Sequence, residues 1–143
     1  MKISTKGRYA IRVLIDLAEH NNGEFITLMD IAGRQEISEK YLEAIVSILS
    51  KNDLLISLRG KGGGYKLAKA PEQYTVGSIL RLTEGSLAPV SCLEKTPNNC
   101  TRATECRTLH MWEEFYKLTN DYFDGITIAD LVKKNDSADY YMI

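Results

Sequence analysis

The sequence predicts a mainly α fold with a small β wing, namely a winged helix-turn-helix followed by a long C-terminal dimerisation helix. Two short amphipathic helices joined by a tight turn are predicted between residues 27 and 51. A glycine-rich hairpin follows them directly, between residues 55 and 68. A stripe of aromatic residues then runs along a predicted helix beyond the third cysteine. Together these features favour one small core with a helical appendage.

Length and charge narrow the classes of protein. The 143 residues contain no apolar run of membrane-spanning length, and the opening MKISTKGRYA lacks the apolar stretch of a secretion signal. We therefore expect a cytoplasmic protein without a membrane partner. Residues 1–70 carry 11 Lys and Arg against 8 Asp and Glu, whereas residues 71–143 carry 7 against 11. The positive half coincides with the predicted helix-turn-helix, which favours nucleic-acid contact there.

A first helix is predicted from Ser4 or Thr5, either of which can cap it. Its apolar stripe consists of Ala10, Val13, Leu14, Leu17 and Ala18. Lys2, Lys6 and Arg8 lie at its start, where positive charge opposes the helix dipole. These cations either contact a phosphate or belong to a solvated helix end, and both interpretations stay open.

The helix-turn-helix begins at Thr27, which can cap a helix while Asp30 reaches back to it. A break at Glu36-Ile37 leads to Ser38, a second predicted cap. The apolar faces of the two helices are formed by Leu28, Ile31 and Ala32, and by Leu42, Ile45, Val46 and Leu49. Such a short connection is typical of a DNA-reading pair whose second helix enters the major groove.

The wing is predicted from the strand Leu55–Leu58, the turn RGKGGG and the strand Tyr65–Ala68. Four glycines in five positions allow positive φ angles and close approach to another surface. Four basic residues and no acidic one lie between Arg59 and Lys69, which suits phosphate contact or a narrow minor groove. An ordinary solvated hairpin is the alternative, and the position directly after a helix-turn-helix favours the wing.

Beyond the wing, a short helix over residues 75–83 is followed by a loop to about residue 105. A long helix is predicted to begin around Cys106 and to carry a stripe of Leu109, Trp112, Phe115, Tyr116, Thr119, Tyr122 and Phe123. A second copy of this helix in a dimer would bury the stripe, and packing within the monomer is the alternative. Thr127 caps a final short helix, and residues 135–143 form a loosely held tail.

The three cysteines, Cys92, Cys100 and Cys106, lie within fifteen residues of one another. In a cytosolic protein this clustering favours a ligand set or redox-reactive thiols over a disulfide framework. The spacing differs from that of zinc knuckles, but iron–sulfur clusters also take thiolate ligands, sometimes with a histidine. His110 lies four residues after Cys106, on the same face if a helix has begun there. A metal centre and free thiols both remain open from spacing alone.

Four segments together resemble the IscR family: MKISTKGRYA, SEKYLEAIVSIL, LRGKGGGYKLA and the three-cysteine loop before a Trp-bearing helix. These are dimeric winged-helix bacterial transcription regulators, a group that includes NsrR and CymR. The resemblance runs from Met1 to about Lys133. It implies a winged helix-turn-helix domain over residues 1–83, a cluster loop over 84–106, dimerisation and C-terminal helices over 107–134, and a tail over 135–143.

The resemblance also implies roles for individual residues. Tyr41 and Glu43 stand where the family reads base edges, and a carboxylate there can accept from cytosine N4. Arg59 matches the wing arginine that enters the minor groove. The residues expected at the DNA surface are Lys2, Arg8, Ser38, Glu39, Lys40, Tyr41, Glu43, Arg59, Gly60, Lys61, Gly62 and Gly63.

By the same resemblance, Cys92, Cys100 and Cys106 are expected to bind an iron–sulfur cluster. The family histidine falls at Leu109 here, with His110 one residue further, so His110, a partner-chain residue, a small-molecule thiol or water are the alternatives for the fourth ligand. A 2Fe–2S cluster is favoured over 4Fe–4S, because Arg8 stands in the region where the NsrR branch has an acidic ligand. The CymR branch lacks the cysteines.

The expected function is therefore a homodimeric, DNA-binding transcription regulator that binds promoter operators and senses iron–sulfur status, redox state or nitric oxide. The alternative is a cluster-free DNA-binding regulator that uses thiol redox or a partner protein as its signal, as in cysteine and sulfur metabolism. The sequence has no P-loop spacing, nucleophile elbow or paired His/carboxylate motif, so we do not expect an enzyme.

Overall fold

The structure is a computed structural model that describes residues 2–95, 97–98 and 100–133. Its elements follow in the order α1 Thr5–Glu19, α2 Leu28–Gln35, α3 Glu39–Lys51, β1 Leu55–Leu58, β2 Gly64–Leu67, η1 Pro71–Gln73, α4 Val76–Glu84, η2 Ser91–Leu93, α5 Leu109–Asp124 and α6 Ile128–Lys133. The predicted tail lies outside the described residues. No helix among those described is long and apolar enough to cross a membrane.

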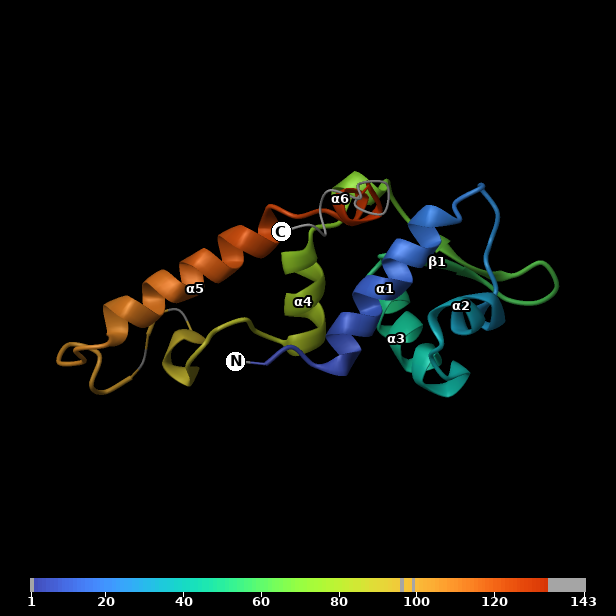
Figure 1. Cartoon of the computed structure of the whole chain (residues 1–143). Coiled ribbons are helices and arrows are strands. Elements are labelled where there is room, and N and C mark those ends of the chain that lie inside the picture. Colours follow the sequence, from blue (N-terminus) through green and yellow to red (C-terminus); the bar gives the residue numbers. More distant parts are fainter. Residues whose placement is uncertain (1, 96, 99, 134–143) are drawn as a thin grey trace.

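Helix α1 lies at the centre of the fold, in contact with α2, α3, α4 and α6 (Figure 1). Its predicted apolar stripe is buried, apart from Ala18, which is half-buried. The predicted apolar face of α3 is also buried, and it packs into the same core. Burial of these two stripes, at about 25 cal/mol per Å² of apolar surface, is the main force that holds the helices together.

Hydroxyl side chains cap the N-termini of five of the described helices. Ser4, Thr27, Ser38 and Thr75 each accept a hydrogen bond from a backbone N–H three residues on, which satisfies one of the free donors of the helix start. Before α6, Thr127 and Asp130 exchange both bonds of a capping box, each at 3.0 Å. At α2 the structure describes only the bond from the N–H of Asp30 to Thr27, at 3.1 Å.

Strands β1 and β2 pair antiparallel, with Leu55 opposite Leu67 and Leu58 opposite Gly64. The second strand begins at Gly64, one residue before the predicted start, because Gly64 adopts a φ of 145° and pairs with the end of β1. Tyr65 also exchanges two backbone hydrogen bonds of 2.8 Å with Ile26, just before α2. The wing is therefore joined to the chain that leads into the helix-turn-helix.

Helix α5 extends away from the helix-turn-helix, and α4 lies between α5 and α1 (Figure 1). Arg81 of α4 holds it in place, donating to Asn120 at 2.9 Å and to Asp124 at 2.5 Å. After α5 the chain returns to the core, where Ile128 donates to the carbonyl of Tyr74 at 2.9 Å.

The prediction that the long helix begins around Cys106 is wrong, because α5 begins at Leu109. Residues 101–108 are polar apart from Ala103 and Cys106, and all of them except Ala103 are exposed. A helix there would bury no apolar face, and most helical stability in proteins comes from packing such a face. Leu109 and Trp112 are the first residues of the segment to offer one, and both are half-buried.

Candidate nucleic-acid interface and cysteine loop

Helix α3, the predicted recognition helix, presents its polar side to solvent. Glu39, Lys40, Tyr41 and Glu43 are all exposed, and Tyr41 retains 39% of its accessible surface. Because Leu42, Ile45, Val46 and Leu49 occupy the buried face, these polar side chains project outward near the start of the helix. The sequence-predicted reading residues of α3 thus share one accessible surface.

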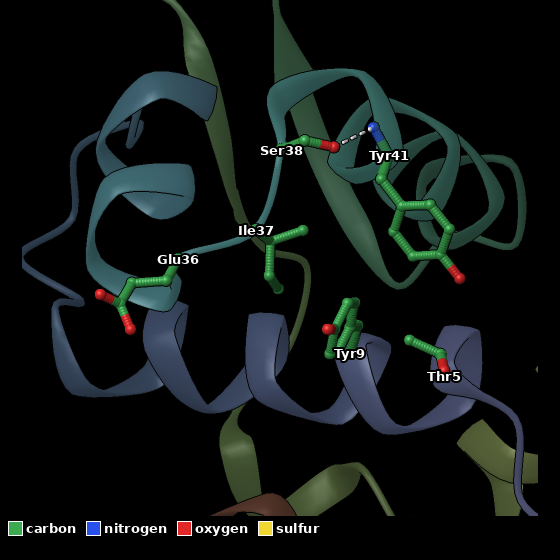
Figure 2. A pocket seen from close by; sticks show the side chains of 6 residues that line it. All are labelled: Thr5, Tyr9, Glu36, Ile37, Ser38 and Tyr41. Atoms are coloured by element: carbon green, nitrogen blue, oxygen red, sulfur yellow. Dashed lines mark hydrogen bonds between the residues drawn. The ribbon is translucent and has the colours of Figure 1, made fainter.

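A hollow of about 460 Å³ separates the start of α1 from the start of α3, lined by Thr5, Tyr9, Glu36, Ile37, Ser38 and Tyr41 (Figure 2). The rings of Tyr9 and Tyr41 meet edge to face, with their centroids 5.6 Å apart. Such a contact orients an aromatic side chain as well as stabilising it. Tyr9 was not among the residues predicted from sequence, and it is the neighbour that positions Tyr41.

A polar network around the buried Asp16 joins α1 to the end of α2. Asp16 is 0% exposed and accepts two hydrogen bonds from Arg34, at 3.0 and 2.8 Å, and one from Gln35 at 2.9 Å. The hydrogen bond to Asp16 raises the pKa of Arg34 above its ordinary value. Arg12 donates to the side chain and the carbonyl of Gln35 and lies over the Tyr9 ring.

This network fixes the turn before α3, because Glu36 follows Gln35 directly and ends α2 in the left-handed conformation, with φ 55°. The sequence patterns considered above did not predict this network. The available signal was an aspartate among the apolar positions of the first helix, since a buried carboxylate requires hydrogen-bonding partners.

The wing tip depends on its glycines. Gly60 and Gly62 have φ angles of 90° and 78°, and a side chain at Gly63 would collide with the backbone carbonyl of Leu58. Arg59 and Lys61 are exposed beside this turn. At the base of the wing, the buried Tyr74 hydroxyl donates to the carbonyl of Leu54 at 2.6 Å, and desolvation raises its pKa.

The remaining predicted DNA contacts lie at the start of α1. Lys2 and Arg8 are exposed, and Arg8 donates to Thr5 at 3.1 Å. The N–H and hydroxyl of Ser4 both donate to Glu84, the last residue of α4, at 2.8 and 2.7 Å. The start of α1 is thereby tied to the point where the cysteine loop, defined here as residues 85–108, leaves α4.

The three cysteines have free thiols in different settings. Cys92 is half-buried on η2, whereas Cys100 and Cys106 are exposed and line one hollow of about 480 Å³. A hydrogen bond with Thr108, whose oxygen lies 3.5 Å from Sγ, lowers the pKa of Cys106, and the charge of Arg102 adds to this effect. Exposure and a lowered pKa are the conditions for a nucleophilic or metal-binding thiolate.

His110 lies on the first turn of α5 with 86% of its side chain exposed, and its Nε2 is 4.0 Å from Glu114. Because Cys106 precedes the helix, the two do not share a helical face. Among the described residues, no three His, Cys, Asp or Glu side chains lie close enough together to hold a metal ion. The thiol chemistry suits an iron–sulfur cluster, but only Cys100 and Cys106 share a hollow here.

Large apolar side chains remain exposed along one side of α5: Met111 at 52%, Phe115 at 43%, Leu118 at 67% and Tyr122 at 63%. Their spacing of four, three and four residues is that of a coiled-coil seam. Trp112, Tyr116 and Phe123 of the predicted stripe are instead half-buried. The predicted stripe therefore divides into a part that packs within the chain and a part that faces solvent. Met111 and Leu118, which belong to the solvent-facing part, were not in the predicted stripe.

Comparison with known proteins places this architecture in a family. Residues 3–134 match the model of the Rrf2 family, described as an iron-dependent transcriptional regulator. IscR of Erwinia tasmaniensis, a helix-turn-helix-type transcriptional regulator, is 36% identical over 136 residues, which cover 95% of this chain and 81% of the relative. These relatives agree with the expectation that the protein is not an enzyme.

Solved structures give the same result. CymR of B. subtilis, titled the global cysteine regulator, has a TM-score of 0.76 and 34% identity, covering 94% of this chain and 98% of that one. IscR of T. potens has a TM-score of 0.71 and 35% identity, covering 100% and 93%. Both the winged helix-turn-helix fold and the resemblance noted in the sequence are confirmed. The chain belongs to the Rrf2 family of transcriptional regulators.

Proposed function

We propose that the protein is a homodimeric regulator that binds promoter DNA through α3 and the wing, under the control of its cysteine loop. The observation that carries this proposal is the placement of α3 and the wing around one polar hollow, lined from both by residues such as Ser47 and Arg59. A helix and a hairpin that border one hollow can enter adjacent grooves of a duplex together.

The α5 seam supports the homodimer. Exposed Met111, Phe115, Leu118 and Tyr122 form a continuous apolar stripe, which a second copy of the same helix would cover with identical side chains. Two reading surfaces in one particle would then bind an operator with two half-sites.

We further propose that Cys92, Cys100 and Cys106 hold an iron–sulfur cluster, with a 2Fe–2S cluster favoured. When bound, such a cluster supplies a centre whose oxidation state and integrity respond to redox conditions, iron supply and nitric oxide. The thiolate character of Cys106 and its shared hollow with Cys100 support this assignment. Cys92 must join them for the site to form, so cluster loading would draw the three cysteines together.

A second candidate signal, direct oxidation of a cysteine thiol, is supported by other observations. Cys106 is exposed and its pKa is lowered, so its thiolate can react directly with oxidants in a cluster-free protein. CymR of B. subtilis, a solved structure similar to this chain, is titled a cysteine regulator. We therefore keep thiol-based regulation as the alternative for the signal, with the same DNA-binding function.

The central test is binding to a pool of promoter fragments, measured by fluorescence anisotropy across salt concentrations. We expect selective binding whose affinity falls by roughly 10³ or more between 50 and 200 mM salt, if six or more phosphates are contacted. No selective binding with either loaded or cluster-free protein would contradict the DNA function.

The signal is tested separately on protein purified without oxygen. Visible charge-transfer absorption together with bound iron and sulfide, lost in Cys92→Ser, is the result expected for a cluster. Protein without iron or sulfide, whose DNA affinity still changes on thiol oxidation, would support the alternative signal and exclude the cluster.

A further inference from the structure

The polar hollow between α3 and the wing has a volume of about 430 Å³ and is called here the inter-groove hollow. Ser47, Ser50 and Lys51 line it from the last turns of α3, and Ser57, Arg59 and Gly60 line it from the wing. None of the serines, nor Lys51, was among the residues predicted to contact DNA. Arg59 and Gly60 of its lining are predicted DNA contacts, but no contact has so far been assigned to the α3 side of the hollow.

The chemistry of the inter-groove hollow suits an anion. Its lining includes two cations, Lys51 and Arg59, and no acidic residue. Ser47 and Ser57, which also line it, are exposed residues that carry a hydroxyl. The Oγ of Ser50 is buried and has no hydrogen-bond partner among the described residues, so hydrogen-bonding capacity is also unused at the wall of the hollow.

The position of the hollow indicates which anion. If α3 lies in the major groove and the wing in the adjacent minor groove, one sugar–phosphate strand separates the two elements and must pass between them. The inter-groove hollow is the space between the same two elements. This step depends on the proposed DNA-binding function, and it adds a specific contact to that function.

We propose that the inter-groove hollow is the seat of a backbone phosphate of duplex DNA, held by the ammonium of Lys51 and the hydroxyls of Ser47 and Ser57. Charge-assisted contacts of this kind position a protein on DNA without reading sequence. Lys51 also ends α3, where a cation favours the helix dipole. That local role affects folding stability, whereas the phosphate contact affects the salt dependence of DNA binding.

The first measurement compares Lys51→Gln with Lys117→Gln as a matched control, using a duplex selected from a promoter-fragment pool. Lys117 lies on α5 and pairs with Asp121 of the same helix at 2.7 Å, away from the reading surface. We expect Lys51→Gln to lower the slope of log affinity against log salt by about 0.9. Its affinity deficit would then shrink about 3.5-fold between 50 and 200 mM salt, with the slope of Lys117→Gln unchanged.

The second measurement places a single uncharged methylphosphonate at successive positions of the same duplex. One position should weaken binding of the wild-type protein but leave Lys51→Gln unaffected, because the charge pair is then already broken. Thermal unfolding of Lys51→Gln and Lys117→Gln identifies any loss of fold. Ser57→Ala keeps Lys51 but removes one proposed hydroxyl contact. This variant should bind the unmodified duplex more weakly and should be less sensitive to methylphosphonate at the same position.

Three outcomes would overturn the seat. The first is an unchanged salt slope for folded Lys51→Gln, and the second is a methylphosphonate effect that adds to that of the mutation at every position. The third is competition by inorganic phosphate at matched ionic strength, because this indicates a site for the free ion. If the wild-type protein bound no duplex at all, the proposed function itself would fail, so the two failures are distinguishable.

Discussion

The helix-turn-helix with its wing and the cysteine loop with α5 are built in opposite ways. In the first region, the buried carboxylate of Asp16 is paired within the chain, with Arg34 and Gln35. In the second, thiols and large apolar side chains remain exposed, as at Cys106 and Leu118. The first region satisfies its buried carboxylate within one chain, whereas in the proposed function the exposed groups of the second bind a ligand or a partner. In the proposed function, reading and regulation are thus separated along the chain.

Asp16→Ala should have the largest effect on the helix-turn-helix. It leaves the guanidinium of Arg34 and the amide of Gln35 without their acceptor, next to a turn that depends on them. We expect a loss of about 3 kcal/mol in the free energy of unfolding, measured with urea. Asp121→Ala, which removes an exposed ion pair on α5, should cost less than about 1 kcal/mol. Equal losses for the two variants would contradict the contrast between the regions.

Leu118→Asp should act on assembly and leave the fold intact. The side chain is 67% exposed in the single chain, so the charge disturbs no core contact. In the proposed dimer it would be buried in the seam, and we expect the dimer to weaken by about 2 kcal/mol or more. Analytical ultracentrifugation measures the change, with Glu113→Gln on the other side of α5 as the control. An unaltered association constant would place the interface elsewhere.

Arg59→Ala is expected to weaken DNA binding by about 1–3 kcal/mol at one base-step position, if the wing reads groove shape or base edges. Competition between duplexes that differ at single steps measures this effect. Arg59→Lys keeps the charge but loses the planar guanidinium, so it should retain phosphate affinity and lose the step preference. A uniform loss over all sequences would make Arg59 a phosphate contact alone.

Thr108→Val should give the smallest effect, a change in thiol reactivity. The hydrogen bond from Thr108 lowers the pKa of Cys106, so the wild-type thiol is more ionised at neutral pH than it would be without this bond. Removing the hydroxyl should slow alkylation of Cys106 a few-fold at pH 7, with the difference disappearing well above the thiol pKa. Mass spectrometry at several pH values measures the rates, and identical profiles would exclude this hydrogen bond as the cause.

Local signals were sufficient to predict much of the fold. Ser38 caps α3 as expected, and Leu42 through Leu49 bury the predicted face, because capping and helical periodicity are properties of adjacent residues. The start of α5 was mispredicted because an aromatic stripe indicates that a helix exists but not where packing begins. The Asp16 network joins residues 18 and 19 positions apart, so it became visible only once α1 and α2 were placed together.

In the candidate site, too, features set by local sequence were predictable and features set by tertiary packing were not. The outward direction of Tyr41 and Glu43 follows from helical periodicity, and the turn at Gly60 and Gly62 follows from its glycines. The Tyr9–Tyr41 contact depends on how α1 crosses α3, which no local pattern encodes. Where the thiols lie was equally unpredictable, because few apolar contacts constrain residues 100–108.

The paired bonds between Ile26 and Tyr65 have a consequence for the DNA that this protein can accept. They join the wing to the chain that enters α2, and a side chain at Gly64 would collide with the carbonyl of Ile26. If α3 and Arg59 enter adjacent grooves as proposed, these bonds limit how far the distance between them can vary. An operator must match that interval, and inserting one base pair between the two contacted segments should cost more binding than changing a base within either.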